Sequence, residues 1–435
     1  MRLTGTLSPK QHRSLLTSNR RINLWTGAIR SGKTIASLLR WLQYVANEAP
    51  RGGELFMVGQ TLQTIERNLL GPLMDPAVFG ELAQYVHHTD GSNTAIIMGR
   101  KVALVGATDV KAFRRIRGAT SAGAYVDELS LLPAGFLTEL LGRLSLKGAR
   151  LFGTTNPDGP AHWLKVEYLD QAGSLDLAHF TFTLDDNPSL DAEYVRNIKA
   201  EHKGLWYKRL ILGQWVAAEG VVYEAWDPDV HVVSTLPVMD RWLGVGIDYG
   251  TTNPFDAVLL GRGRETLPDG SRGPTRLYIA REHRYDPKVE KQRQTDAQHS
   301  KDLRDWLASI DRETGAPNPH PHTEVRPDFI TVDPSAASFI EQLNHDKVHG
   351  VTTADNSVVD GIRTVSSLLA TDRLRVHESC VDLVREKASY SWDDKATAEG
   401  LDKPLKVADH AVDAERYVIH TTEPLWRPHV GRIAA

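Results

Sequence analysis

Residues 27 to 34 combine two glycines, a lysine and a threonine in a spacing that suits phosphate binding. The run is Gly27-Ala28-Ile29-Arg30-Ser31-Gly32-Lys33-Thr34. It follows a short apolar stretch, Ile22–Trp25, and it opens a segment whose apolar residues have helical spacing. Backbone amides and a helix N-terminus together attract anions, so the run predicts a nucleoside triphosphate site rather than a chance glycine-containing turn. Lys33 would reach the β- and γ-phosphates, and the Thr34 hydroxyl would bind Mg²⁺.

A phosphate-binding loop of this kind needs acidic partners at the end of a neighbouring strand. The apolar run Ala122–Val126 ends in Asp127 and Glu128. Asp127 fits the acid on the Mg²⁺ side, and Glu128 fits the base that orients the attacking water. The alternative is an acidic pair that merely begins a helix.

The arginines near these motifs have several possible roles. Arg30 lies inside the loop, where a guanidinium could approach the γ-phosphate in cis. Arg114, Arg115 and Arg117 cluster in a second basic stretch. They could act in trans on a neighbouring subunit, contact a DNA backbone, or form a solvated basic face.

Aspartates in the second half of the chain form another candidate site. Asp248 and Asp333 each end an apolar run, and Asp409 and Asp413 stand one helical turn apart with His410 beside them. Carboxylates from two strand ends and a helix could hold two divalent ions roughly 4 Å apart, which is the logic of ribonuclease-H-like phosphodiester cleavage. His410 could orient a ligand or a water. Aspartates that only cap turns or helices are the alternative.

The elements that must position these residues alternate between strands and helices. Strands are expected at Ile22–Trp25, Glu54–Gly59, Lys101–Gly106, Ala122–Val126 and Ala149–Thr154, which predicts a largely parallel sheet with helices on both faces. A second alternating pattern contains strands at Trp242–Tyr249, Ala257–Leu260, Leu277–Arg281 and Phe329–Val332, and helices at Lys288–Ser309, Val358–Leu369 and Val407–His420. We therefore predict an α/β domain over residues 1–184, a small helical linker over 185–240, and a second α/β domain over 241–435.

Composition limits the class of protein. The net charge of −4 is weak evidence against a nucleic-acid binder, because such proteins often carry a local basic surface on a neutral body. The single cysteine, Cys380, excludes a disulfide framework within the chain and a cysteine-rich zinc site. No apolar run reaches the roughly 18 residues of a membrane-spanning helix, and no secretory signal begins the sequence. These features favour an intracellular protein without a membrane partner.

Taken in order, these motifs resemble the large terminase subunits of tailed bacteriophages, the motors that package DNA into capsids. Gly27–Thr34, with its arginine, looks like the family's Walker A loop, and Tyr125–Glu128 looks like its Walker B strand. Gly153–Pro157 is similar to the coupling motif, in which Thr154, Thr155 and Asn156 would sense loss of the γ-phosphate. The segment from Asp186 to Val216 looks like the linker. Gln11 stands where the family has a glutamine that contacts adenine, although the surrounding motif is short.

The resemblance extends to the second half of the chain. Asp248, Asp333 and Asp413 fall where the family's nuclease triad lies, and residues 409–417 resemble its last catalytic helix. The fold implied is a P-loop NTPase domain joined by a linker subdomain to a ribonuclease-H-like nuclease domain. ATP with Mg²⁺ would drive movement of double-stranded DNA, and two Mg²⁺ or Mn²⁺ ions would serve the cutting of concatemeric DNA.

The resemblance also implies partners and a place of action. The expected partners are the small terminase subunit, the portal protein of the procapsid, and further copies of the chain in a ring, pentameric in this family. The expected place is the host cytoplasm, transiently at the portal vertex and outside the mature virion. Two rival hypotheses are a helicase-nuclease of DNA repair and a P-loop motor whose second domain only binds DNA. The helicase is less favoured, because such enzymes usually have a second motor domain with its own arginine motifs, whereas the stretch after Asp240 indicates an acidic metal site.

Overall fold

The computed structural model describes residues 7–107, 110–318 and 323–431. The chain forms two compact units. The first unit consists of residues Met1–Val195, Leu205–Ala217 and Lys395–Leu401, and the second consists of Arg196–Gly204, Ala218–Asp394 and Asp402–Ala435. The residues of the predicted linker, 185–240, are thus shared between the two units, and the division into three parts stays a prediction.

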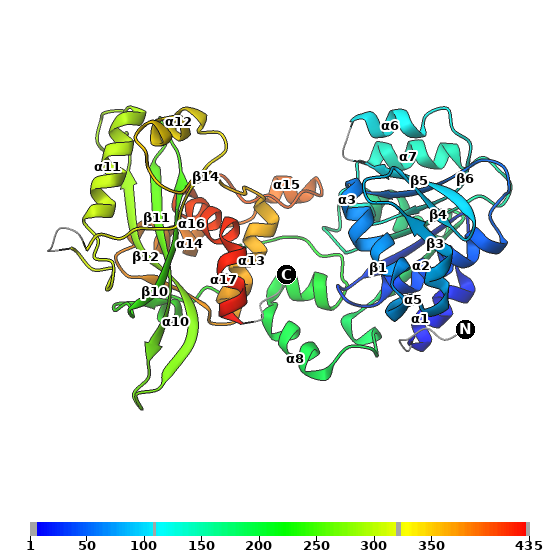
Figure 1. Ribbon diagram of the computed structural model, residues 1–435, viewed down its shortest axis with the longest axis horizontal. Helices are drawn as coiled ribbons and strands as arrows, with labels where there is room; N and C mark the ends of the chain where they lie inside the picture. The colour runs from blue at the N-terminus through cyan, green and yellow to red at the C-terminus, as the bar shows by residue number, and fades with distance from the viewer. Residues whose placement is uncertain (1–6, 108–109, 319–322, 432–435) are drawn as a thin grey trace. The chain divides into compact units, whose positions relative to one another are not determined.

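The first unit is built on a mainly parallel sheet (Figure 1). Its strand order is β3-β4-β5-β2-β6-β7-β1-β8, and every neighbouring pair from β5 to β8 is parallel, while β3, β4 and β5 form an antiparallel edge. The strands are β1 Ile22–Gly27, β2 Glu54–Gly59, β3 Val86–His88, β4 Thr94–Ile97, β5 Arg100–Gly106, β6 Ser121–Val126, β7 Arg150–Thr155 and β8 Leu177–Phe182. This arrangement confirms the predicted fold class of the first half.

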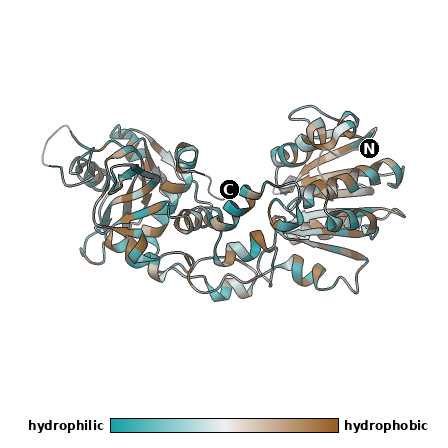
Figure 2. Cartoon of the chain, turned by 90° about the horizontal axis from the view of Figure 1, so that it is seen from below, coloured by the Kyte–Doolittle hydropathy of each residue, from teal (hydrophilic) through white to brown (hydrophobic). Residues whose placement is uncertain are grey.

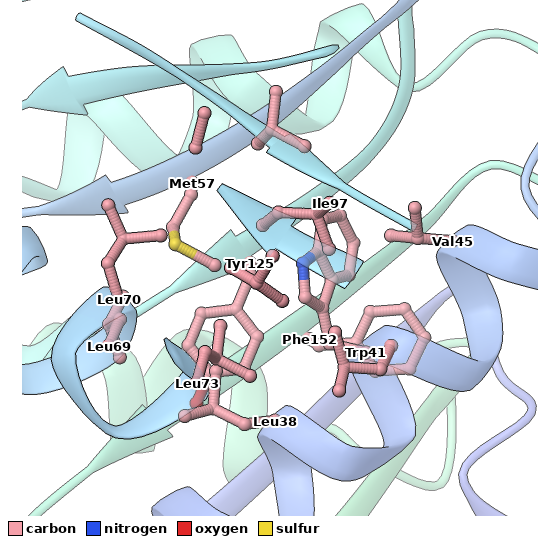
Figure 3. Close-up of a cluster of buried hydrophobic side chains, with 14 of the residues drawn as sticks. Leu38, Trp41, Val45, Met57, Leu69, Leu70, Leu73, Ile97, Tyr125 and Phe152 are labelled. Carbon is pink, nitrogen blue, oxygen red and sulfur yellow. The ribbon is translucent and has the colours of Figure 1, made fainter. Parts of the chain in front are cut away.

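Helices cover both faces of this sheet, so its central strands are buried. The α-helices are α1 Pro9–Thr17, α2 Lys33–Asn47, α3 Leu62–Ile65, α4 Gly71–Met74, α5 Pro76–Phe79, α6 Val110–Ile116 and α7 Ala134–Arg143. Trp41, Tyr125 and Phe152 pack together in the core under α2 (Figure 3). Phe136 and Leu140 of α7 belong to a separate core cluster with β1 and β6 residues. In Figure 2 the hydrophobic colour recurs along the strands, in keeping with these two cores.

The second unit is built on a mixed sheet with strand order β14-β13-β10-β11-β12-β15-β9. The strands are β9 Val232–Val233, β10 Met239–Asp248, β11 Phe255–Thr266, β12 Arg272–Tyr285, β13 Phe329–Val332, β14 Val351–Thr353 and β15 Leu374–His377. Strands β10, β11 and β12 are antiparallel, and the other neighbouring pairs are parallel. Strands β11 and β12 form a long hairpin that extends well beyond the short runs predicted from hydrophobicity, because its outer part is polar.

The remaining helices belong mainly to the second unit. They are α8 Ala192–Glu201, α9 Gly204–Trp206, α10 Pro228–His231, α11 Asp296–Ala308, α12 Ala337–His345, α13 Val358–Ala370, α14 Val381–Ser389, α15 Asp394–Ala398, α16 His410–Thr421 and α17 Glu423–Val430. Short 3₁₀ or π turns complete the chain at η1 Glu66–Leu70, η2 Gly80–Tyr85, η3 Leu129–Leu131, η4 Lys165–Leu169, η5 Leu184–Asp186 and η6 Tyr207–Ile211. No helix of the described residues is long and apolar enough to cross a membrane.

Helix α16 lies directly on strand β10. A Cβ at Gly246 would lie 1.9 Å from the carbonyl oxygen of Ala414, and a Cβ at Gly244 would lie 3.1 Å from Val418. Two glycines of the strand thus let the helix backbone approach closely. This packing brings the helix that carries Asp413 to the strand that ends in Asp248.

Three predicted helices differ from the observed ones. The helix expected from Lys288 begins only at Asp296, since Thr295 and Gln298 form a capping box there. The helix expected from Val407 begins at His410, and Asp409 occupies the N-cap position with φ −122°. The predicted helical linker, 185–240, is not one continuous helix, because α8 ends at Glu201 and α9 begins at Gly204, where φ is +49° and a Cβ would collide with the Glu224 side chain.

Candidate nucleotide site and acidic site

The phosphate-binding loop depends on glycines at its two bends. Gly27, at the end of β1, has φ +138°, and a Cβ there would lie 2.0 Å from the carbonyl oxygen of Phe182. Gly32 caps α2 in the left-handed region with φ +77°, and a Cβ there would lie 2.2 Å from Nε2 of Gln11. Only glycine fits these positions without strain, so the conformation of the loop requires both glycines of the motif.

Side chains from outside the loop hold its backbone in place. Gln11 Nε2 donates to the carbonyl oxygen of Ser31 at 2.8 Å, and Asn187 Nδ2 donates to that of Arg30 at 2.7 Å. The Ile29 amide donates to the Leu210 carbonyl at 3.0 Å. Gln11 is buried and its Oε1 accepts from the Ser8 amide. Its amide group therefore supports the loop, and its expected contact with adenine stays a prediction.

Lys33 and Ser31 place polar groups where an anion would bind. Lys33 is 5% exposed, and its Nζ donates to Asn156 Oδ1 at 2.6 Å and to the Ala28 carbonyl at 3.2 Å. Burial lowers the pKa of Lys33, and the carboxylates of Glu128 and Asp127 oppose this shift. Within the described residues, the buried hydroxyl of Ser31 has no hydrogen-bond partner, as expected for a group that binds phosphate. Thr34, half-buried, follows in the first turn of α2.

Asp127 and Glu128 follow strand β6 beside this lysine. Thr154 Oγ1 donates to Asp127 Oδ1 at 2.7 Å. Burial raises the pKa of both carboxyl groups, while the Thr154 hydrogen bond opposes the shift at Asp127 and the charge of Lys33 opposes it at Glu128. Glu128 has φ +46°, a left-handed conformation that is uncommon outside glycine.

The segment expected to couple hydrolysis to movement contacts both the lysine of the loop and the two carboxylates after β6. Besides the Thr154 bond to Asp127, Thr155 Oγ1 donates to Ser130 Oγ at 2.6 Å. Asn156 accepts from Lys33 and donates through Nδ2 to Glu128 Oε1 at 3.3 Å. The structure thus brings the predicted Walker A, Walker B and coupling residues into one connected network. Ser130 and Asn187 are members of it that the sequence motifs do not indicate.

The arginines remain exposed. Arg30 lies in the loop with φ +51°. Arg114 and Arg115 are exposed on α6, and Arg117, just after it, has its Nε 3.9 Å from Glu139. None of the proposed arginine roles in cis or in trans is tested by these positions.

The acidic site of the second unit centres on a pair of side chains from β10 and α16. Asp248 Oδ2 lies 2.8 Å from His410 Nδ1. Burial raises the pKa of Asp248, and the charges of Asp413 and Asp333 add to this shift, although His410 opposes it. Burial opposes the charged form of His410, but the bond to Asp248 raises the pKa of the imidazole overall. His410, Asp413 and Asp333 therefore all lie within electrostatic reach of Asp248.

The other aspartates have partners of their own. Asp333 Oδ1 accepts from the Ser335 amide at 2.8 Å, which is a turn-capping bond. Asp413 is buried and receives Arg416 Nη2 at 2.9 Å and Lys406 Nζ at 2.6 Å. The same Lys406 Nζ lies 3.0 Å from Asp409 Oδ2.

Asp248, Asp409 and Asp413 of the predicted metal site are bound to histidine, lysine or arginine side chains in this arrangement. The oxygens of Asp248, Asp333, Asp409 and Asp413 suit a divalent cation by their chemistry. Here, however, Lys406 and Arg416 neutralise Asp413, and His410 binds Asp248. In the parts of the chain that the structure describes, no group of three or more histidine, cysteine, aspartate or glutamate side chains is placed to hold a metal ion. The coordination group expected from the sequence would therefore require these side chains to move, and it stays a prediction.

A buried ionic network next to this site is absent from the sequence prediction. Glu386 of α14 accepts the Ala411 amide at 2.7 Å and Arg284 Nη1 at 2.7 Å. It therefore caps α16, whose N-cap residue Asp409 makes no side-chain capping bond. Arg284 also lies 3.0 Å from Asp256, the direct cross-strand neighbour of Asp248. The aspartate inside the apolar run Phe255–Leu260 is the one signal that could have indicated this network.

Comparisons with known proteins assign the chain to a family. A family model described as "Terminase large subunit, T4likevirus-type, N-terminal" matches residues 24–226. The structure of the large terminase from a thermophilic bacteriophage is similar over 96% of this chain and 99% of that one, with 33% sequence identity and a TM-score of 0.82. The chain belongs to the large terminase family. The fold class expected from the resemblance is confirmed.

Further similarities concern bound nucleotide and a second phage. The same thermophilic-phage large terminase in complex with ADP is similar at 33% identity, and its complex with ATP-γ-S at 34%, each with a TM-score of 0.80 and the same coverage of 96% and 99%. The large terminase subunit of Escherichia phage T5 is 33% identical over 97 residues, which span 22% of this chain and 22% of that protein. These similarities support an ATPase among the DNA-packaging proteins.

Proposed function

We propose that this large terminase hydrolyses ATP in its first unit and uses the energy to move double-stranded DNA into a procapsid. The observation that carries the proposal is the network in which Asn156 contacts both Lys33 and Glu128. The thermophilic-phage large terminase, whose full length this chain matches, has been solved with ADP and with ATP-γ-S, which supports a nucleotide at this loop.

Each residue of this site has a distinct role in the proposed hydrolysis. When ATP enters, Lys33 would exchange its bond to Asn156 for the β- and γ-phosphates, and Ser31 would gain a partner. Glu128 would orient the attacking water, and its raised pKa makes it a stronger base once it is ionised. Mg²⁺ held by Thr34 and Asp127 would neutralise phosphate charge. Departure of the γ-phosphate would return Lys33 to Asn156 and so report hydrolysis to the segment Thr154–Asn156.

Replacing the proposed base tests the ATPase assignment. Glu128→Gln is expected to bind ATP-γ-S normally while kcat falls by roughly 10²–10⁴-fold, the typical contribution of a general base. Glu167→Gln, an exposed glutamate of the same unit, should hydrolyse ATP like the parent chain. Turnover by Glu128→Gln at the parental rate would remove Glu128 from the mechanism.

We further propose that the second unit cuts concatemeric DNA at the start and end of packaging. The supporting observation is the Asp248–His410 pair with Asp333, Asp409 and Asp413 in its electrostatic neighbourhood. Two Mg²⁺ or Mn²⁺ ions bound by these carboxylates would generate a hydroxide and stabilise the leaving oxygen. Contacts to phosphates rather than bases would suit a motor that slides along any sequence.

Plasmid cleavage separates this proposal from its rivals. With Mn²⁺ the parent chain is expected to nick or linearise supercoiled plasmid, and Asp248→Ala should lose at least about 100-fold in rate, a loss comparable to removing a general base. Asp269→Ala, in the exposed turn between β11 and β12, is the control. Cleavage by Asp248→Ala at the parental rate would favour a second unit that binds DNA without cutting it.

The proposed motor works in an assembly with other proteins. The small terminase subunit, the portal protein and further copies of this chain in a pentameric ring would be its partners in the host cytoplasm at the portal vertex. Arg114, Arg115 and Arg117 are the candidates for acting on a neighbour's ATP, and all three are exposed, whereas Arg30 is the candidate in cis. Parent subunits can be mixed with subunits that carry a single arginine substitution. For the arginine that acts in trans, the ATPase activity should fall by more than the fraction of variant subunits in the mixture.

A further inference from the structure

The ammonium group of Lys406 lies where a divalent cation would bind in the acidic site. Its Nζ lies 2.6 Å from Asp413 Oδ2 and 3.0 Å from Asp409 Oδ2, so one ammonium bridges two carboxylates that are themselves buried. An ammonium group has no lone pair to offer a metal, while Mg²⁺ and Mn²⁺ take the same oxygen atoms as ligands. The lysine and a divalent ion therefore cannot share these two oxygens.

Lys406 and Arg416 differ in how firmly they are held. Arg416 is buried, and besides Asp413 Oδ1 it donates to the Asn356 carbonyl at 3.2 Å. The Lys406 side chain is 61% exposed and reaches the carboxylates from the solvent side. Arg416 thus stays with one oxygen of Asp413, whereas Lys406 can leave the other.

The chain around Lys406 is tied down at its two ends and exposed between them. The Leu405 amide donates to the Ser391 carbonyl at 2.9 Å, and the Asp409 carbonyl accepts the Asp413 amide at 2.8 Å. Between these points Val407 is exposed, and Ala408 has φ +48°, a conformation that costs free energy for a residue other than glycine. A short exposed bend with a strained residue can change conformation without disturbing β10 or α16.

We propose that Lys406 is a displaceable internal cation that holds Asp409 and Asp413 together and competes with a divalent metal for them. With Lys406 in place the two carboxylates are largely neutralised, and the site is closed to metal. With Lys406 withdrawn, Asp409 and the Oδ2 atom of Asp413, which Arg416 does not hold, are open to a divalent ion. The inference builds on the proposed nuclease, because it assigns the metal to these carboxylates, but metal binding can be measured without cleavage.

The test is Mn²⁺ titration of the full chain by calorimetry in the absence of nucleotide. Lys406→Ala and Lys406→Met are expected to bind Mn²⁺ about tenfold more tightly than the parent chain, since an ion pair worth about 1.4 kcal/mol corresponds to that factor. Lys406→Met keeps the length of the side chain without its charge, so it also serves if the alanine variant folds poorly. Lys403→Ala removes an exposed lysine from the same stretch and should bind Mn²⁺ like the parent.

The double variant Asp409→Asn, Lys406→Met tests whether the added Mn²⁺ affinity arises at Asp409. It should lose the gain in Mn²⁺ affinity that Lys406→Met shows. Parental or weaker Mn²⁺ binding by Lys406→Met would overturn the inference, and so would a gain that survives Asp409→Asn. If Lys406→Met binds Mn²⁺ more tightly and no form of the chain cuts plasmid, the nuclease proposal fails and the competition stands. If the parent cuts plasmid and Lys406→Met shows no gain in affinity, the nuclease stands and the competition fails.

Discussion

Asp256 carries a carboxyl group that is completely buried in the second unit, beside Arg284. Burial raises its pKa to about 9, the nearby Glu386, Glu282 and Asp382 add to the shift, and Arg284 opposes it. Because the pKa in the folded state lies above the unfolded value of about 3.9, the group stabilises the fold at low pH. This contribution is lost progressively as the pH rises from about 4 towards 9.

A neutral isostere should remove that pH dependence. Compared with the parent, Asp256→Asn is expected to gain stability steadily between about pH 5 and about pH 9, since the asparagine has no proton to lose. Urea unfolding at several pH values measures the difference in the free energy of unfolding. Asp269→Asn, at an exposed turn where Ser271 lowers the pKa of the aspartate, should show no such gain. A difference that stays constant with pH would mean that Asp256 is ionised throughout.

At the scale of elements, the position of α16 on β10 decides whether the acidic residues meet. Gly246→Ala would place a Cβ 1.9 Å from the Ala414 carbonyl oxygen and push the helix away from the strand. We expect the free energy of unfolding of the second unit to fall by about 1–3 kcal/mol, the usual cost of overpacking. Plasmid cleavage should fall with it, while ATP hydrolysis by the first unit should remain within twofold.

The control is a glycine in the same sheet at which an added Cβ would meet a milder contact than at Gly246. At Gly273 in β12 the nearest atom to an added Cβ is the Glu265 carbonyl oxygen at 3.3 Å. Gly273→Ala should therefore cost less stability than Gly246→Ala and should leave cleavage nearly unchanged. Equal effects of the two substitutions in urea unfolding and cleavage assays would show that close packing of α16 does not control the site.

At the scale of the whole molecule, two compact units with separate cores should respond to different ligands. ATP-γ-S at about 100 times its Kd stabilises the form that binds it by about 2.7 kcal/mol. For a unit of roughly 200 residues this corresponds to an increase in Tm of roughly 5–10 °C. Differential scanning calorimetry is expected to show this increase in one transition only, with the other unmoved.

Lys33→Ala provides the control for the calorimetry. It removes the ammonium that would bind the phosphates, so ATP-γ-S should no longer shift either transition. A single transition that moves as a whole in the parent chain would show instead that the two units unfold cooperatively.

The motifs that could be predicted are those whose chemistry is local. Gly27, Gly32, Lys33 and Thr34 belong to one continuous segment between a strand and a helix, and Asp127 follows a strand that is buried throughout. Short-range spacing and burial determine such structures, so the parallel sheet and the arrangement of the loop follow from the sequence. The predicted helix starts near Lys288 and Val407 are wrong. The capping box at Thr295 sets one start, and the Glu386 carboxylate, which accepts the Ala411 amide, caps the other.

The sequence alone determined which residues could perform the chemistry, because residue type and local spacing specify a phosphate-binding loop and a set of aspartates. Tertiary structure decided which of those residues meet. Asn156 lies between Lys33 and Glu128 since β1, β6 and β7 are neighbours in one sheet, although their residues are far apart in the chain. Likewise, Lys406 forms ion pairs with Asp409 and Asp413 because burial leaves their carboxylates in need of a charged partner. The spacing of the three residues in the sequence does not reveal these ion pairs.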